Sequence, residues 1–133
     1  MSIDIEALVT AFLRGQTTVT DLADDRVYTD MPHKRTWPMV VVIRTGGESL
    51  YKNWLQQIEL EINAYGGTHK VAYNLANACM STMAAAMVGS HVEGVVTKVK
   101  AGAVTYSPDS ESADESGHAR PRYTVNATVT AHP

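Results

Sequence analysis

The chain has 133 residues, of which 44% are hydrophobic and 19% are charged, a composition typical of a globular protein with its own hydrophobic core. The formal net charge of -3 argues against a general electrostatic attraction to nucleic acid or to an anionic membrane. Cys79 is the single cysteine, so an intramolecular disulfide is excluded and a reducing compartment is expected.

We expect residues 1–133 to form one cytoplasmic domain. Residues 1–6 include two acids, where a secretory signal peptide would carry basic residues. The longest helix-like apolar segment, residues 71–88, is interrupted by polar residues that a bilayer would disfavour.

The N-terminal part of the chain is predicted to contain one helix and one short strand. Ser2 is the expected cap of a helix in which apolar residues recur at helical spacing until Gly15. Residues 17–25 are polar and are predicted to be a connector. Residues 26–29 are predicted to form a short strand, which Pro32 closes.

Two strands form the predicted centre of a sheet. Residues 39–45 are predicted to form a strand, and its run of Val and Ile without alternation predicts burial on both faces. Gly46-Gly47 predicts a hairpin turn, after which residues 50–65 return as an antiparallel partner. Residues 57–65 alternate strictly, which predicts one apolar face and one polar face. The polar face must meet water, a channel or a neighbouring subunit, and its residues are Gln57, Glu59, Glu61 and Asn63.

A second, longer helix is predicted from the Thr68 cap to about Met87, with Gly89 at its C-terminal end. Its apolar residues form two adjacent stripes, which together are wider than contact with one sheet requires. The first stripe is Val71, Leu75, Ala78, Thr82 and Ala85, and the second is Ala72, Ala76, Cys79, Met83 and Met87. Two interpretations remain open, because the second stripe can pack either in the protein's own core or against another subunit. In the latter case the candidate interface residues are Ala72, Ala76, Met83 and Met87.

Residues 92–106 and 122–131 are the final predicted strand pair. Their connection, residues 107–118, is longer than the about two to five residues of a usual hairpin loop. It contains four acids and no apolar anchor, so we expect it to be disordered in the isolated chain. These acids are candidate contacts to a neighbouring subunit or ring, and they are Asp109, Glu111, Asp114 and Glu115.

The predicted fold is therefore α+β. We expect a mostly antiparallel sheet of about four to five strands, with the N-terminal helix and the long helix packed on one face. The expected order is α-β-β-β-α-β-β, with a long acidic hairpin loop between the last two strands.

The sequence shows no motif for metal or cofactor binding, and none is expected. The five histidines are scattered without ligand spacing to one another or to the cysteine. Cys79 lies on the apolar side of its helix and is predicted to be a small buried hydrophobic residue.

Glu59 and Glu61 are the only pair that suggests catalysis, because carboxylates about 7 Å apart on a strand face are compatible with glycoside hydrolysis. The interpretation we favour is that cross-strand basic residues neutralise them. The candidate polar sheet face, lining a lumen or meeting a neighbour, is then Glu59, Glu61, Asn63, Lys98, Lys100 and Arg122.

Two functional alternatives to a purely structural protein remain open. One is a small oligomeric enzyme whose intersubunit site uses Glu59, Glu61, Arg122 or His118. The other is a nucleic-acid-binding sheet, which the net charge disfavours. Lys34 and Arg35 beside Trp37 are too few basic and aromatic residues to indicate a nucleic-acid contact.

Several segments up to about Gly89 follow one another in a distinctive order. They are a helix with Ala7-Leu8 and Phe12-Leu13, then Asp25-Arg26-Val27-Tyr28, Pro32, the apolar run 37–43, the alternating run 58–66 and the long helix. In this order the chain resembles the tail terminators of long-tailed bacteriophages, also called tail completion or tail-to-head joining proteins.

The resemblance implies a structural virion protein without catalytic residues. It implies a homo-hexameric ring that caps the tail tube, ends tail polymerisation and joins the tail to the head connector, while DNA passes through the hole without specific binding. The implied partners are further copies of the chain, the major tail tube protein and head–tail connector proteins, without a membrane. The implied location is the virion tail at the head–tail junction, after assembly in the host bacterial cytoplasm. Another connector, head-completion or minor tail ring protein is the nearest alternative.

Overall fold

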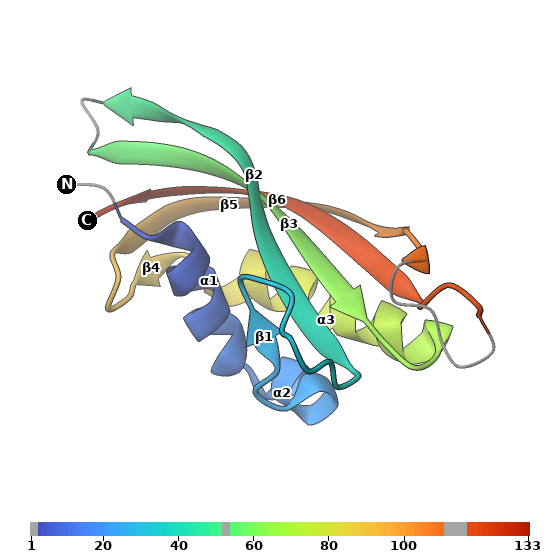
Figure 1. Ribbon diagram of the computed structural model, residues 1–133. Helices are drawn as coiled ribbons and strands as arrows, with labels where there is room; N and C mark the ends of the chain where they lie inside the picture. The colour runs from blue at the N-terminus through green and yellow to red at the C-terminus, as the bar shows by residue number, and fades with distance from the viewer. Residues whose placement is uncertain (1–2, 52–53, 111–116) are drawn as a thin grey trace.

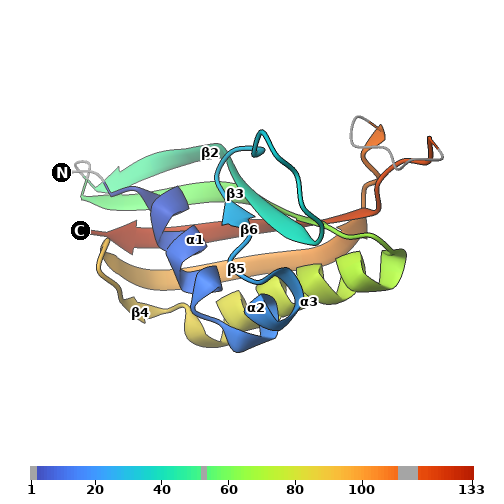
Figure 2. The same cartoon turned by 60° about the horizontal axis from the view of Figure 1, so that its bottom comes forward.

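The computed structural model describes residues 3–51, 54–110 and 117–133. In these residues three helices cover one face of a six-stranded sheet with the order β1-β2-β3-β6-β5-β4 (Figures 1 and 2). In chain order the elements are α1 (Ile5–Arg14), α2 (Thr17–Ala23), β1 (Val27–Tyr28), β2 (Met39–Tyr51), β3 (Leu55–Tyr65), α3 (His69–Ala86), β4 (Gly89–Ser90), β5 (Val95–Tyr106) and β6 (Arg122–His132).

The α+β class and the helices on one face are confirmed, but the strand count is higher than the four to five predicted. β1 confirms the short strand predicted at residues 26–29, whereas β4 was not predicted and is the sixth strand. β4 has only two residues. The sheet is mixed, since β1 runs parallel to β2 while every other pairing is antiparallel. A strand as short as β4 carries no periodicity that a sequence can display.

The N-terminal helix begins two residues later than expected. Asp4 is its N-cap, and the Asp4 carboxylate accepts a hydrogen bond from the Ala7 backbone N–H at 3.0 Å. Ser2, the predicted cap, lies outside the described residues. Gly15 closes the helix as predicted.

Residues 17–25 were predicted to be a connector, and this prediction is wrong. Thr17–Ala23 forms α2, in which Val19 and Ala23 are fully buried and Leu22 packs at the margin of the core. These three apolar residues have the i, i+3, i+4 spacing of one helical face. The helix is short and otherwise polar, so its composition resembles that of a loop.

The Gly46-Gly47 pair does not form the predicted turn. β2 continues through both glycines to Tyr51, and the pairing with β3 shifts between Arg44 and Gly46. Gly47 has φ +146°, and a Cβ atom there would lie 2.7 Å from the Gln57 carbonyl oxygen. At these two glycines the β2–β3 ladder is irregular and the two backbones lie close together. Glycine is found inside strands for both of these reasons, and not only at turns.

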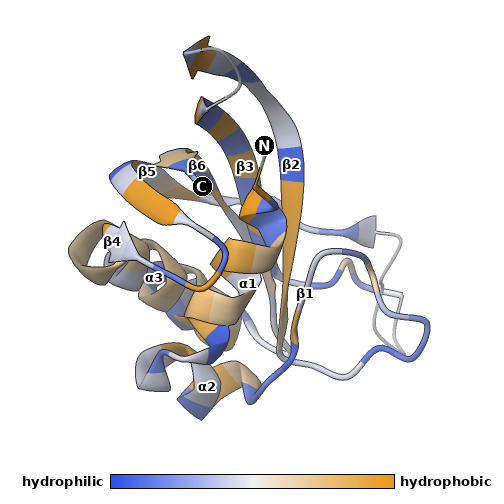
Figure 3. Ribbon diagram, turned by 90° about the vertical axis from the view of Figure 1, so that its left-hand side faces the viewer, coloured by the Kyte–Doolittle hydropathy of each residue, from blue (hydrophilic) through white to orange (hydrophobic). Residues whose placement is uncertain are grey.

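Because the strand does not turn at these glycines, the β2–β3 hairpin is longer than predicted. Its distal half extends beyond the helical layer as a projecting arm (Figure 1). Figure 3 shows β2 hydrophobic beside the helices and largely hydrophilic along this arm, in agreement with burial of residues 39–42 and exposure of most residues beyond them.

The main hydrophobic core lies between the helices and the inner sheet face. α3 has its predicted Thr68 cap, whose hydroxyl accepts from the Val71 N–H at 3.3 Å. Cys79 is fully buried as predicted, and burial raises the pKa of its thiol to about 12. No helix in the described segments has both the length and the apolar character needed to cross a bilayer.

The second stripe of α3 faces this core. Ala72, Ala76, Met83 and Met87 are each 0% exposed in the single chain. Of the two interpretations left open by the sequence, the structure therefore supports the one in which the stripe packs in the protein's own core. α3 contacts the sheet on one side and the two N-terminal helices on another. Its apolar arc is wide because it packs against both.

A smaller hydrophobic cluster covers one end of the outer sheet face. Met39, Val41 and Tyr65 are buried there, with Tyr28, Met31 and Trp37 packed against them. Val40 and Val42 belong to the main core on the other face. Burial of this part of β2 on both faces is thus confirmed, although β2 lies near the edge of the sheet rather than at its centre.

Candidate functional site

The polar outer face of the sheet divides into two regions. Near the small hydrophobic cluster, Asn63 is 1% exposed and its Oδ1 accepts a hydrogen bond from the Thr124 hydroxyl at 2.8 Å. Asn63 is therefore part of the interior. The prediction that it lines an open surface is wrong. The alternating pattern of β3 correctly placed Asn63 on the outer face of the sheet. It could not predict that side chains from residues 29–38 cover this end of the face.

Arg122 lies at the same end of the sheet and does not pair with Glu59 or Glu61. Its Nε donates to the Ser107 carbonyl at 2.7 Å, and its Nη1 donates to the Tyr65 hydroxyl at 3.3 Å. Arg122 therefore fixes the start of the 107–118 connection against the sheet.

The open region of the outer face carries the remaining predicted charges. β6 lies between β3 and β5, so Thr128 stands between Glu59 and Lys100, and Thr130 stands between Gln57 and Lys98. Residues on β3 and β5 are two strand spacings apart, about 10 Å. The predicted direct cross-strand neutralisation is therefore wrong.

The charges on this region are separated by sign across the sheet. Glu48 of β2 lies opposite Gln57, in the same row as Thr130 and Lys98. Acids therefore occupy the β2–β3 side and lysines occupy the β5 side, with uncharged β6 residues between them. An open hollow of about 370 Å³ joins the two sides, and its lining includes Glu59, Lys100, Asn126 and Thr128.

The predicted acidic loop is described only at its ends. Asp109 forms an isolated antiparallel bridge with Arg120, with backbone hydrogen bonds of 3.0 and 2.9 Å. The Arg120 guanidinium lies 4.4 Å from the centre of the Trp37 ring. Glu111, Asp114 and Glu115 lie outside the described residues. The loop therefore has a fixed base on the outer sheet face.

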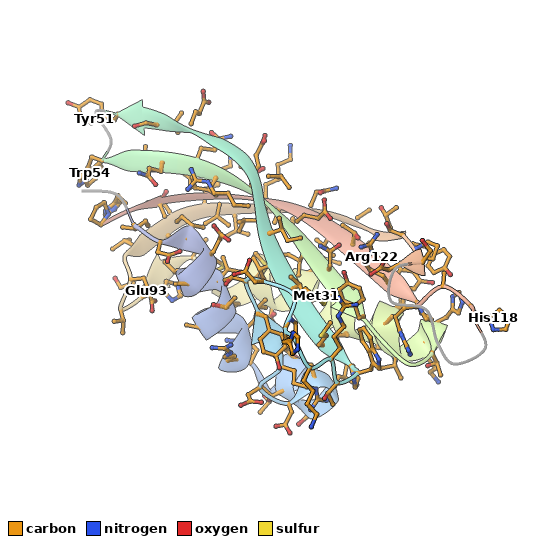
Figure 4. All side chains as sticks on the ribbon, viewed as in Figure 1. Met31, Tyr51, Trp54, Glu93, His118 and Arg122 are labelled. Atoms are coloured by element: carbon orange, nitrogen blue, oxygen red, sulfur yellow. The ribbon has the colours of Figure 1, made fainter. Side chains whose placement is uncertain are left out.

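Two exposed apolar groups at opposite ends of the sheet were not predicted from the sequence. At the tip of the β2–β3 arm, Leu50, Tyr51 and Trp54 are 44%, 61% and 49% exposed (Figure 4). At the other end, Tyr73 of α3 and Tyr106 of β5 both contact the Tyr123 ring. The arm could have been found by interpreting Gly46-Gly47 as a bulge, whereas the tyrosines meet only in the folded chain.

The residues suggested for an intersubunit active site do not converge within one chain. Glu59 and Glu61 lie on the central part of β3, Arg122 is held at the end of β6, and His118 lies in the β5–β6 connection (Figure 4). The described residues contain no group of three or more His, Cys, Asp or Glu side chains arranged to hold a metal ion.

No family model matches the chain, and no curated protein matches its sequence. Its fold is similar to that of a chain in a solved structure titled "Virion of native gene transfer agent (GTA) particle". The TM-score is 0.58 at 15% sequence identity, and the similarity covers 96% of this chain and 94% of the other. At this identity the comparison establishes a shared fold over nearly the whole length of both chains.

Proposed function

We propose that this protein is a structural component of a phage-like virion. The observation that carries the proposal is the similarity of fold, over 96% of this chain, to a chain of a gene transfer agent virion. The order of segments that resembles the tail terminators supports the same class independently of the structure. We further propose the specific role of those proteins: a hexameric ring that caps the tail tube, stops its growth and joins the tail to the head connector.

The architecture suits a ring. A cyclic ring uses two different surfaces on each subunit, and this sheet has two edges of different composition. All helices lie on one sheet face, which leaves a polar outer face available to border a central hole (Figure 2). On that face the acids Glu48, Glu59 and Glu61 outnumber the lysines Lys98 and Lys100, so it has no net positive charge to hold DNA phosphates and DNA would pass with little friction.

The two ends of the sheet suit contacts with different partners. One end carries the apolar arm tip, and the other carries the tyrosines and the base of the 107–118 loop (Figure 4). In our proposal one end meets the tail tube protein and the other meets the connector, with the loop ordering only in the assembly.

The experiment that tests this role is electron microscopy of particles assembled without the protein. We expect tails of uncontrolled length that are not joined to heads, and restoration of normal particles when the intact gene is supplied. Tails of normal length accompanied by empty or leaking heads would contradict the terminator role and indicate head completion.

The proposed role of the loop has a separate test. Deleting residues 109–116 should leave the folded subunit intact, as measured by its thermal unfolding, but reduce the number of joined particles. Normal head–tail joining by this variant would contradict an assembly role for the loop.

A further inference from the structure

The outermost strands β1 and β4 have two residues each, so the long strands next to them, β2 and β5, lack a described partner on their outer side over much of their length. β1 pairs only with Val40 and Val41, so the outer side of β2 has no described strand partner from residue 43 to residue 48. β4 pairs only with Val95 and Val96, so β5 is likewise unpaired from residue 97 to residue 106 within the described chain. Such edges present backbone donors and acceptors that a further strand can complete.

The directions of the strands fit a repeated arrangement. β2, β3, β6 and β5 are neighbours in this order, and each pair is antiparallel (Figure 1). β2 and β5 therefore run in opposite directions within one subunit. A rotation about an axis roughly along the strands would place β5 of one copy beside β2 of the next copy in antiparallel orientation, which continues the alternation.

The charges at the two edges are complementary. Glu48 on β2 is exposed, as are Lys98 and Lys100 on β5. The ladder places Glu48 and Lys98 in one row, and Gly46 and Lys100 in the next row on the same face. Pairing without stagger would set Glu48 opposite Lys98, and a shift of two residues would set it opposite Lys100. Closing a sheet into a barrel requires such a stagger.

We propose that the β2 edge (residues 43–48) of one copy pairs with the β5 edge (residues 97–106) of a second copy in antiparallel orientation. The sheet then continues from subunit to subunit, with Glu48 facing a lysine of its neighbour. This inference rests on the proposed ring and identifies the surfaces that close it. The contact is heterologous, because each copy offers a different edge to each of its two neighbours.

A charge exchange tests the side-chain part of the contact. Glu48→Lys places three cations at the interface and should lower the yield of rings at least tenfold in native mass spectrometry, because like charges on facing strands repel. Combining it with Lys98→Glu or with Lys100→Glu should restore the yield to within about threefold, and the combination that succeeds identifies the register. Undiminished ring formation by Glu48→Lys, or rescue by neither combination, would overturn the inference.

A proline tests the backbone part. The Val40 N–H donates to the Arg26 carbonyl oxygen, on the side of β2 away from β3. Backbone N–H groups of a strand alternate in direction, so the Arg44 N–H, four residues later, also points away from β3. Arg44→Pro removes this outward donor without removing a hydrogen bond to β3. Arg44→Ala is the matched control, since it loses the same side chain but keeps the N–H. We expect rings from Arg44→Ala and an at least tenfold loss with Arg44→Pro, at similar melting temperatures.

Failure of edge pairing and failure of the terminator role give different experimental results. Where the purified protein forms rings only on tail tubes, its incorporation into tails replaces mass spectrometry as the measurement. Wild-type rings together with normal assembly of Arg44→Pro would overturn edge pairing and leave the ring intact. Normal tails in particles that lack the protein would overturn the terminator role, while the purified variants would still decide how copies associate.

Discussion

Truncation of Met83 to alanine distinguishes a core side chain from an interface side chain on α3. Met83 is 0% exposed in the single chain, between the helix and the sheet. Removing a buried methionine to alanine costs about 2–5 kcal/mol, because apolar burial is lost and a cavity is left. We expect about 3 kcal/mol. An unfolding entropy of about 2.1 cal/mol/K per residue gives roughly 0.28 kcal/mol/K for a chain of 133 residues, so the melting temperature should fall by about 11 °C.

The assay is thermal unfolding followed by circular dichroism, at a concentration where the protein is monomeric. Met80→Ala is the matched control, since Met80 lies on the same helix but is only partly buried at the margin of the core. Its melting temperature should fall by less than about 4 °C. A fall of less than about 2 °C for Met83→Ala, together with loss of self-association, would refute the core assignment and return Met83 to the subunit interface.

Four further predictions concern the stability of the fold. Asp4→Ala should destabilise the protein by about 1 kcal/mol in urea unfolding through loss of the helix cap, and Asp4→Ser should restore most of it. Gly66→Ala should cost more than about 2 kcal/mol, because its Cβ would lie 2.7 Å from a backbone nitrogen of α3, and an unchanged urea midpoint would contradict this packing. Thr124→Val should cost about 1–3 kcal/mol by leaving the buried Asn63 amide oxygen unpaired, whereas adding Asn63→Leu should recover part of that loss in a double-mutant cycle. Because burial raises the pKa of Cys79 to about 12, the folded state keeps this proton at pH values where the unfolded thiol has lost it. The contribution of Cys79 to stability is therefore complete below about pH 8.5 and decreases above it by at most about 1.4 kcal/mol per pH unit, and Cys79→Ala should show a shallower decline between pH 9 and 11.

The elements that could be predicted from the sequence are those with strong periodicity or a capping residue. α3 was found because Thr68 caps a long stretch with apolar helical spacing, and β3 was found because residues 57–65 alternate. α2 was missed because a short helix needs only one small apolar face. The hairpin turn was misplaced because Gly46-Gly47 fits either a turn or a close backbone approach, and only the position of Gln57 distinguishes them.

The candidate site was harder to predict than the fold, because it depends on strand order. The sequence places Glu59 and Lys100 on outward faces of two strands, but nothing in it states that β6 lies between them. Insertion of β6 turns an expected neutral patch into a face with acids on one side and lysines on the other. Likewise, the burial of Asn63 depends on a distant segment that contributes Met31 and Trp37 to the cover.

The most direct test of the central claim is a cryo-electron microscopy reconstruction of the head–tail junction in virions that contain this protein. We expect a closed ring of copies at the end of the tail tube, with the β2 edge of each copy beside the β5 edge of the next and the polar sheet face toward the DNA. A reconstruction in which the chain is absent from the junction, or in which its copies do not contact one another, would contradict the account.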